Sequence, residues 1–384
     1  MDAVILAAGG GTRLLPLTTY RPKPMIPIAN RPLLKYILAG IRRMSEKYKV
    51  DRIYILVDHL ANVIIQGIGD EFYGIPVIYI RDNIPHGTAG AVRRILDRLS
   101  DPFFCIHADI VTDFSFSDLI DFYYNKKGVA ALTLTPVEDT RNFGVVSLDK
   151  DGRILSFIEK PQGKTDVKTV NAGIYVFTHE AFRFTNTDSQ EDMARHQFPA
   201  LLKNGVELYG LVSRSYWNDI GNPAAYLRTT YDVISGKVRN YFQLVNDSTR
   251  EDIRLPAPNR NQMNGDKNNV SFIHNGNCII FCGDSFIPTD ITVNDFMLVG
   301  DCVDIKSKTV ITSSVIWNNV KIGQGCVISD SIVGENVEIG DMTRIESGSV
   351  IGDRCIIGKR CVISHETKLW CGSRVTDDAK IMPD

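Results

Sequence analysis

The chain has 384 residues, of which 44 % are hydrophobic and 23 % are charged, and its net charge is −2. This length and composition predict a soluble globular protein with two or three domains. The nearly neutral charge argues against nucleic-acid and anionic-membrane binding, and no apolar run approaches the roughly 20 residues of a membrane span, so we expect neither partner.

The N-terminus and the cysteines favour a cytoplasmic protein. An apolar run begins at residue 3, which leaves no room for a signal peptide. Cys105 is followed by seven cysteines from Cys278 onward, and none of these is spaced as the two C-x-x-C pairs of a zinc site. We therefore expect reduced, mostly buried thiols.

Residues 3–34 are the most informative stretch. The apolar run 3–8 is too short for a helix and predicts a buried parallel strand. The three glycines at 9–11 let the backbone approach a ligand and offer N–H groups to an anion. Arg13 and Lys23 add positive charge, and prolines on both sides stiffen the chain around Lys23. The stretch predicts a polyphosphate-binding loop.

Two common phosphate-binding motifs do not fit this loop. The dinucleotide fingerprint G-x-G-x-x-G fails because Leu14 stands at the third glycine. The P-loop fails because no Gly-Lys-Ser/Thr follows at its spacing.

Alternating strand and helix patterns follow the loop. Strands are expected at 52–57, 76–80, 103–108 and 130–136, with helical segments at 32–44, 86–99 and 118–125. This alternation predicts a parallel sheet with helices on both faces. Because such sheets bind ligands beyond the carboxyl ends of their strands, Gly9, residues 86–89 and Asp109 should lie near that edge.

From residue 143 the pattern changes to shorter strands, at 144–148, 153–158 and 172–177, with a hairpin turn at 149–152. A helix is expected at 189–203, strands at 206–212 and 217–220, and a helix that begins at Pro223. Residues 236–269 are rich in Asn, Asp and Arg and predict a linker or insert.

The last part of the chain is a repeat. Aliphatic residues recur every six positions from Val293 to Ile363, and the phase slips by one residue before Ile316 and before Val333. One buried aliphatic per six residues, with glycine or small polar residues between, predicts a hexapeptide β-helix. The expected domains are therefore residues 1–235, a linker or insert at 236–269, and a β-helix at 270–384.

Several motifs resemble the sugar-1-phosphate nucleotidyltransferase family. The segment L-A-A-G-G-G-T-R-L, continued by P-L-T and P-K-P, matches the family signature. The elements G-T-A at 87–89, F-I-E-K-P at 157–161, N-A-G at 171–173 and W-N-D-I-G-N-P at 217–223 follow in the family's order. The resemblance implies a Rossmann-like, doubly wound mixed sheet of the nucleotide-diphospho-sugar transferase type (class α/β), followed by a left-handed parallel β-helix.

The resemblance also implies roles for individual residues. Nucleotide contacts fall to Leu6, Ala8, Gly9, Gly10, Gly11, Thr12, Gly87 and Thr88. Sugar-phosphate contacts fall to Gly144, Glu159, Lys160 and Asn171, and catalysis to Arg13, Lys23 and Lys160. Asp109 and Asp219 are implied as ligands of Mg²⁺. The chain departs from the family at His107 and Ala108, where Asn-Gly is usual, and at Asn222, where threonine is usual.

The implied reaction joins a sugar 1-phosphate to a nucleoside triphosphate. The attacking phosphate is already ionised, so catalysis consists of positioning and charge neutralisation, without a general base. The motifs look most like those of mannose-1-phosphate guanylyltransferases, with glucose-1-phosphate thymidylyl-, uridylyl- and adenylyltransferases as alternatives.

Two alternatives from other classes remain. A non-catalytic regulatory subunit of the same architecture is disfavoured because the phosphate and metal residues are all present. An acyltransferase function of the β-helix would need a histidine, for which His274 and His365 are the candidates in that domain.

We also expect a homo-oligomer, either a dimer or a dimer of dimers. Val315, Trp317, Val320, Cys326 and Val327 are expected to form an apolar strip on the corners of the β-helix. Such a strip predicts a buried contact, with the N-terminal domain or with another subunit.

Overall fold

The computed structural model describes residues 1–81, 86–163, 165–186, 190–239, 271–275, 278–285 and 287–383. Two compact units make up the chain. The first combines Met1–Gly10 with Leu34–Trp217, and the second combines Gly11–Leu33 with Asn218–Asp384. The segment Gly11–Leu33, which carries most of the sequence signature, thus belongs to the same unit as the β-helix. Most of the expected insert at 236–269 lies outside the described residues, from 240 onward.

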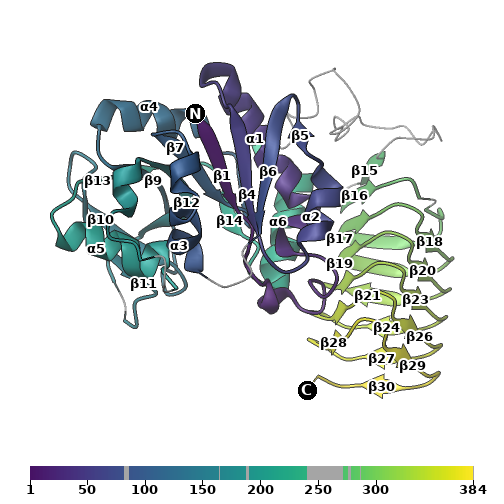
Figure 1. Ribbon diagram of the computed structural model, residues 1–384. Coiled ribbons are helices and arrows are strands. Elements are labelled where there is room, and N and C mark those ends of the chain that lie inside the picture. The colour runs from purple at the N-terminus through teal and green to yellow at the C-terminus, as the bar shows by residue number, and fades with distance from the viewer. Residues whose placement is uncertain are drawn as a thin grey trace. The chain divides into compact units, whose positions relative to one another are not determined.

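The first unit is built on a mixed sheet with the strand order β11-β10-β12-β7-β1-β4-β6-β5, in which β9 pairs with β12 and β13 pairs with β9 (Figure 1). Strand β1 runs parallel to both β4 and β7, and β12 runs antiparallel to β7. The mixed sheet of the expected fold class is confirmed. The strands are β1 (Asp2–Leu6), β4 (Arg52–Val57), β5 (Glu71–Phe72), β6 (Ile75–Arg81), β7 (Phe103–His107), β9 (Ala130–Pro136), β10 (Gly144–Leu148), β11 (Ile154–Glu159), β12 (Thr169–Phe177) and β13 (Leu208–Val212).

Helices cover both faces of this sheet. Alternate residues of a strand point to opposite faces. On one face, Val4 and Leu6 share a core with Val92, and on the other, Phe104 packs against Phe116 with ring centroids 5.0 Å apart. The helices are α1 (Leu33–Lys47), α2 (Ala61–Ile68), α3 (Gly87–Arg93), α4 (Phe116–Lys126) and α5 (Phe198–Lys203), with a π-helical turn η5 (Met193–Gln197) and 3₁₀ turns η3 (Leu96–Arg98) and η4 (His179–Phe182).

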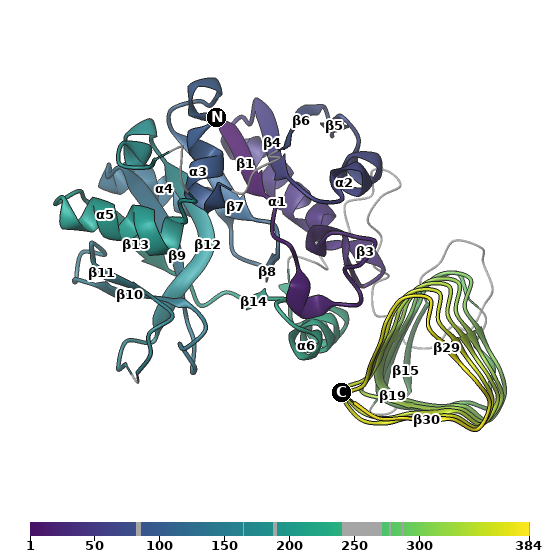
Figure 2. The same cartoon turned by 60° about the horizontal axis from the view of Figure 1, so that its bottom comes forward.

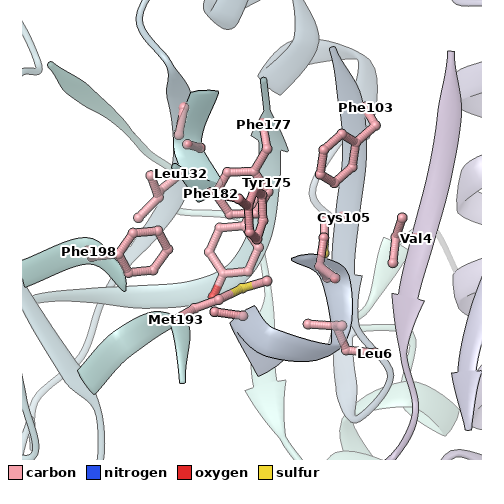
Figure 3. Close-up of a cluster of buried hydrophobic side chains, with 14 of the residues drawn as sticks. Val4, Leu6, Phe103, Cys105, Leu132, Tyr175, Phe177, Phe182, Met193 and Phe198 are labelled. Atoms are coloured by element: carbon pink, nitrogen blue, oxygen red, sulfur yellow. The ribbon is translucent and has the colours of Figure 1, made fainter. Parts of the chain in front are cut away.

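Aromatic rings fill the core on the first of these faces (Figure 3). Tyr175 and Phe177 of β12 and Phe198 of α5 pack at centroid distances of 5.1 to 6.2 Å, in tilted or stacked arrangements. Rings of this size bury a large apolar area each, so this core holds α5 and the turn η5 against the sheet. The helix expected at 189–203 is in fact this turn followed by α5, and it begins at Met193.

The second unit contains the β-helix, which Figure 2 shows end-on as a three-sided coil. From β16 onward its strands pair in parallel from coil to coil, as the expected left-handed hexapeptide fold requires, whereas β15 pairs antiparallel with β16. Ile311, Ile328, Ile345 and Ile363 stack in one such ladder and are at most 1 % exposed. The interior is a continuous aliphatic column, which confirms the six-residue periodicity.

The strands of the β-helix are short. They are β15 (Ser271–Asn275), β16 (Cys278–Cys282), β17 (Thr292–Val299), β18 (Asp304–Ile305), β19 (Val310–Ile316), β20 (Lys321–Ile322), β21 (Val327–Ser329), β22 (Ile332–Val333), β23 (Glu338–Ile339), β24 (Arg344–Ile345), β25 (Val350–Ile351), β26 (Ile356–Ile357), β27 (Val362–Ile363), β28 (Lys368–Leu369), β29 (Arg374–Val375) and β30 (Lys380–Ile381).

The two phase slips of the repeat have a structural cause. Ile311 pairs with Ile328, seventeen residues further on, whereas Ile345 pairs with Ile363, eighteen residues further on. The two coils that start at Ile311 and Ile328 are therefore one residue shorter than those that start at Val293 and Ile345. The missing residue falls between Ile311 and Ile316 and between Ile328 and Val333, where the sequence shows the slips. The sheet accommodates the shorter coil by a register shift between Asn294 and Met297, where β17 pairs with β19.

The rest of the second unit is the segment before the first long helix and the helix that follows the first unit. The segment holds η1 (Thr12–Leu14), η2 (Lys23–Met25), β2 (Pro27–Ile28) and β3 (Arg31–Pro32). Helix α6 (Pro223–Ile234) begins at the expected proline, and Asn222 caps it by accepting a hydrogen bond from the Ala225 N–H at 2.9 Å. Asn222 therefore serves as the helix cap in place of the usual threonine.

The expected apolar strip on the corners of the β-helix is wrong for Val320 and Cys326, whereas the buried contact expected with residues of the N-terminal domain is confirmed for Trp317. Val320 and Cys326 are 0 % exposed and belong to the interior of the coil. Trp317 is 1 % exposed and packs edge-on against Tyr226 of α6, with centroids 6.4 Å apart. The six-residue periodicity predicts which side chains point out of the coil, but not which of them are covered by another segment of the same unit.

The cysteines and the helices give two further results. All eight cysteines are free, and five of them are buried, as expected. In the described ranges, none of the helices has the length and the apolar character that a membrane crossing requires.

Candidate active site

The glycine loop begins at the edge of the sheet where the parallel strands end. β1 ends at Leu6 and β7 at His107, and the Ala108 N–H donates a hydrogen bond to the Leu6 carbonyl at 3.0 Å. The loop residues Gly9 and Gly10 after β1 and Asp109 after β7 therefore start from neighbouring strand ends. This is the arrangement that the sequence predicts, and it suits ligand binding beyond the carboxyl ends of strands.

The glycine loop is open and partly left-handed. Ala8, Gly9 and Gly10 are exposed, and a Cβ atom at Gly9 would meet no other atom within 4 Å. Gly11 has φ +58°, and its carbonyl accepts a hydrogen bond from the Thr18 hydroxyl at 3.0 Å. Backbone of this kind, in which glycine avoids the strain of a side chain, leaves N–H groups available to a phosphate.

In the first unit, the hairpin of β10 and β11 brings Gly144, Glu159 and Lys160 together. Gly144 pairs directly with Glu159, and a Cβ atom on Gly144 would lie 2.9 Å from Oε2 of Glu159, so glycine makes room for that carboxylate. Lys160 has φ +47°, and its Nζ lies 3.7 Å from Oε1 of Glu159. Partial burial raises the pKa of the Glu159 carboxyl, and the charge of Lys160 opposes this shift.

Asn171 lies on the neighbouring strand, where β12 has an irregular register between Asn171 and Tyr175. Its side-chain amide donates to the Tyr175 hydroxyl at 2.8 Å, and its side-chain oxygen accepts from the Gly173 N–H at 3.2 Å. The asparagine side chain is therefore held in one orientation by its own strand.

The start of α3 is joined to a segment that the sequence did not single out. Gly87 has φ +69°, and a Cβ atom there would lie 2.4 Å from the Glu191 carbonyl oxygen. The Thr88 hydroxyl donates to Asp192 at 3.2 Å and accepts from the Met193 N–H at 2.9 Å. Glycine at this position therefore makes room for the backbone of Glu191.

Sequence reasoning thus missed Asp192 and Arg195. Both are near enough to Glu159 to influence its pKa, Asp192 upward and Arg195 downward. Asp192 also caps η5, by accepting hydrogen bonds from the N–H groups of Ala194 and Arg195. An aspartate before an apolar run is a recognisable cap, but only the tertiary fold reveals that this one stands beside Glu159. Short π-helical turns recur at functional sites.

In the second unit, Lys23 and Asp219 form a close ion pair. The Lys23 ammonium lies 2.8 Å from Oδ1 of Asp219, and the lysine side chain is only 8 % exposed. Arg13 adds a second positive charge, with Nη2 at 4.0 Å from Oδ2 of Asp219. A Cβ atom at Gly221 would lie 3.0 Å from that Nη2, so glycine makes room for the guanidinium. Three residues of the predicted phosphate and metal site thus meet within one unit.

The two carboxylates assigned to Mg²⁺ lie in different units, Asp109 in the first and Asp219 in the second. Within the described part of the chain, no group of three or more His, Cys, Asp or Glu side chains could hold a metal ion. Mg²⁺ does not require such a group, because it takes one or two protein carboxylates and completes its shell with phosphate and water. Asp219 is 27 % exposed and offers suitable oxygen ligands.

The structure describes the side chain of His365, one of the two histidine candidates for an acyltransferase. His365 is exposed, and its backbone N–H donates to Glu346 at 3.3 Å. The His274 side chain lies outside the described residues.

Comparison with known proteins identifies the family. The family model "Nucleotidyl transferase" matches residues 2–236, and the model "GMPPB C-terminal domain" matches residues 275–379. The chain therefore belongs to the sugar-1-phosphate nucleotidyltransferase family and carries the C-terminal β-helix domain as well.

Individual relatives share one or both regions. The mannose-1-phosphate guanylyltransferase of Mycobacterium tuberculosis is 30 % identical, over 85 % of this chain and 82 % of that protein. The bifunctional protein GlmU of Methanococcus maripaludis is 33 % identical, over 67 % of this chain and 62 % of that protein. The crystal structure of HddC from Yersinia pseudotuberculosis, complexed with GMP-PN, covers 60 % of this chain and 97 % of that one, with a TM-score of 0.51 and 25 % identity.

Proposed function

We propose that this protein joins mannose 1-phosphate to GTP and releases GDP-mannose and pyrophosphate. The family membership supports a sugar-1-phosphate nucleotidyltransferase. The choice of mannose and guanine draws on the mycobacterial mannose-1-phosphate guanylyltransferase, since that similarity extends over both the sheet and the β-helix. The single observation that favours an enzyme over a regulatory subunit is the buried Lys23–Asp219 pair beside Arg13, which retains the charged groups of the signature.

The proposed reaction asks little covalent chemistry of the protein. An oxygen of the sugar phosphate attacks the α-phosphorus of the triphosphate in line, the bond to the β-phosphate oxygen breaks, and pyrophosphate leaves with that electron pair. The glycine loop, Arg13 and Lys23 bind the triphosphate and neutralise the leaving group, and Lys160 orients the attacking phosphate. Glu159, Asn171 and Gly144 line the sugar site, and Gly87 and Thr88 the nucleoside site. Asp109 and Asp219 would hold Mg²⁺, which supplies charge stabilisation at the phosphates.

A pyrophosphate-release assay tests this proposal. The assay pairs GTP, dTTP, UTP and ATP with mannose, glucose and glucosamine 1-phosphates, and it includes a magnesium-free control. Release with mannose 1-phosphate and GTP above all other pairs is the expected result. A preference for dTTP, UTP or ATP with another sugar would identify one of the alternative transferases. No release with any pair, from a folded chain that still binds nucleotide, would support the regulatory-subunit alternative.

A separate assay tests the acyltransferase alternative. GlmU is named as bifunctional, and this chain covers only 62 % of the Methanococcus maripaludis protein. Consumption of acetyl-coenzyme A with glucosamine 1-phosphate, lost in His365→Ala, would establish that second activity. We expect none.

We further propose that the chain forms a homo-oligomer, and closed two-fold symmetry is the simplest form. Light scattering on the full chain tests this. A monomer at micromolar concentration would refute it.

A further inference from the structure

Arg21 stands two residues before Lys23, and the proposed reaction does not use it. Its guanidinium lies over the Trp317 ring, 4.5 Å from the ring centroid. Nη1 donates to Oε1 of Glu335 at 3.0 Å, and Nη2 donates to Oδ2 of Asp353 at 2.7 Å. All three partners lie on the β-helix, in three successive coils. Side chains of the β-helix therefore contact two edges and one face of the Arg21 guanidinium.

The β-helix provides a shaped seat for this guanidinium. The ladder places Gly334 and Gly352 at the positions of the next coils that correspond to Trp317. A Cβ atom on Gly334 would lie 2.5 Å from Oδ1 of Asp353, so glycine makes room for that carboxylate. Asp353 is itself only 4 % exposed, and its Oδ1 accepts from the Glu335 N–H at 2.9 Å. The carboxylate that meets Arg21 is consequently fixed by the coil itself.

The charge of Arg21 is well matched in this seat. Its side chain is 14 % exposed, and burial alone would favour loss of the proton. The hydrogen bond to Glu335 and the charge of Asp353 outweigh burial and raise the pKa of the guanidinium. A planar guanidinium that stacks and forms two charge-assisted hydrogen bonds is held in one orientation, which an ammonium group would not be.

Trp317 is also connected to the segments that carry Lys23 and Asp219. Trp317 Nε1 donates to the Tyr226 hydroxyl at 2.9 Å, and that hydroxyl donates to the Pro27 carbonyl at 2.7 Å. Tyr226 lies on α6, which begins four residues after Asp219. Pro27 lies four residues after Lys23. Trp317 is therefore linked to the lysine segment on both sides of Lys23 and to the helix that follows Asp219.

From these contacts we propose that Arg21 is a positioning residue. The β-helix seat formed by Trp317, Glu335 and Asp353 fixes Arg21, and the fixed Arg21 in turn keeps Lys23 beside Asp219. Arg21 and Lys23 are separated by Pro22, and Pro24 follows, so the backbone between the seat and the ammonium group has little freedom. The role in turnover rests on the proposed function, whereas the position of Lys23 does not depend on it.

The first experiment measures the position of Lys23 without any substrate. Trace acylation with acetic anhydride, followed by mass spectrometry, gives the reaction rate of each lysine in the full chain. Lys321 is the internal reference, because it lies in the same unit, is 68 % exposed and pairs with Glu338 outside the seat. In Arg21→Met we expect Lys23 to react several-fold faster, while Lys321 is unchanged.

Arg354→Met is the matched control. Arg354 also stacks on a residue of the signature segment, Tyr20, with 4.8 Å between its guanidinium carbon and the ring centroid, but no seat carboxylate is involved. We expect normal Lys23 acylation in this variant. Glu335→Gln is the second variant, since it loosens the more exposed side of the seat and leaves the buried Asp353 in place. Glu335→Gln should raise the acylation rate of Lys23 as Arg21→Met does, but by a smaller factor.

The second experiment compares kcat with KM. If Arg21 positions Lys23 for the departing pyrophosphate, Arg21→Met should lower kcat by about 10- to 100-fold, since a misplacement of 1 Å can cost about 100-fold in rate. The KM for the sugar phosphate should stay within about twofold, because Lys23 is assigned to the departing pyrophosphate and not to the sugar phosphate. Arg21→Lys should recover only part of the rate, as it restores charge without the planar fork.

The outcomes separate the two proposals. Unchanged Lys23 acylation in both Arg21→Met and Glu335→Gln overturns the positioning role, and so does an unchanged kcat in an active enzyme. An inactive wild type, with all substrate pairs, refutes the proposed function, and the acylation rates then decide alone whether the seat positions Lys23. If Arg21→Met does not fold, Glu335→Gln decides in the same way.

Discussion

Lys160 in the first unit and Lys23 in the second are both assigned to phosphate groups, but the protein holds them in different ways. Lys160 is 51 % exposed, and its ammonium lies 3.7 Å from Glu159. Lys23 is 8 % exposed and lies 2.8 Å from Asp219, and its segment contacts the β-helix through Arg21 and helix α6 through Pro27. A long exposed side chain adjusts when a ligand arrives, whereas a buried one is already in place. We therefore expect Lys160 to act mainly in substrate binding and Lys23 mainly in the chemical step.

Replacement of the preorganised lysine should have the largest effect. Lys23→Ala should lower kcat by roughly 10²- to 10³-fold, the range found when one preorganised group is removed from a developing negative charge. Steady-state pyrophosphate release measures this, and circular dichroism checks that the variant is folded. Near-normal turnover of a folded variant would remove the proposed role of Lys23.

The two aspartates test whether the units act on one metal ion. Asp109→Asn and Asp219→Asn should each abolish most activity, and the double variant should lose little more than either single one, because residues that act as a unit are non-additive. The measurement is kcat/KM at several magnesium concentrations. Losses that multiply would indicate that Asp109 and Asp219 act independently.

A smaller and different effect is expected for the exposed lysine. Lys160→Ala should raise the KM for the sugar phosphate by about 10- to 100-fold, which matches the roughly 1.5–3 kcal/mol of a hydrogen bond to a charged group. The change in kcat should be smaller than for Lys23→Ala. Lys150→Ala, at the turn of the same hairpin, is the control and should leave KM unchanged. A loss confined to kcat would contradict the contrast between the two lysines.

The smallest effect concerns Glu159 and pH. Burial raises the pKa of its carboxyl in the folded chain, so the ionised form destabilises the fold above that pKa. This destabilisation disappears as the pH falls through the folded pKa and below the ordinary value of about 4.3. Glu159→Gln should therefore raise the melting temperature slightly at pH 7 and not at pH 4. Functional carboxylates commonly cost a protein some stability. Equal melting curves at pH 7 would show that Glu159 does not.

The two units also differ in how far the sequence predicts them. The aliphatic ladder of the β-helix was foreseeable, including its two slips, because each coil repeats one local rule. The strand ends that carry Gly9 and Asp109 were foreseeable as well, because parallel strands present their carboxyl ends at one edge.

Contacts between distant segments were not foreseeable. The sequence predicts a buried contact at Trp317, but not that Arg21 and Tyr226 form it, 296 and 91 residues away respectively in the chain. The same is true of Asp192 beside Thr88. Such partners depend on the packing of whole elements, and a local pattern does not contain that information.

Coils of seventeen and of eighteen residues occur in one uninterrupted ladder, and both keep the aliphatic column in phase. This tolerance of coil length bears on insertions and deletions within the β-helix. An in-frame duplication or loss of one whole coil away from the Arg21 seat would preserve every ladder contact on either side. A change of that kind within the three coils that carry Trp317, Glu335 and Asp353 would instead separate or remove partners of Arg21.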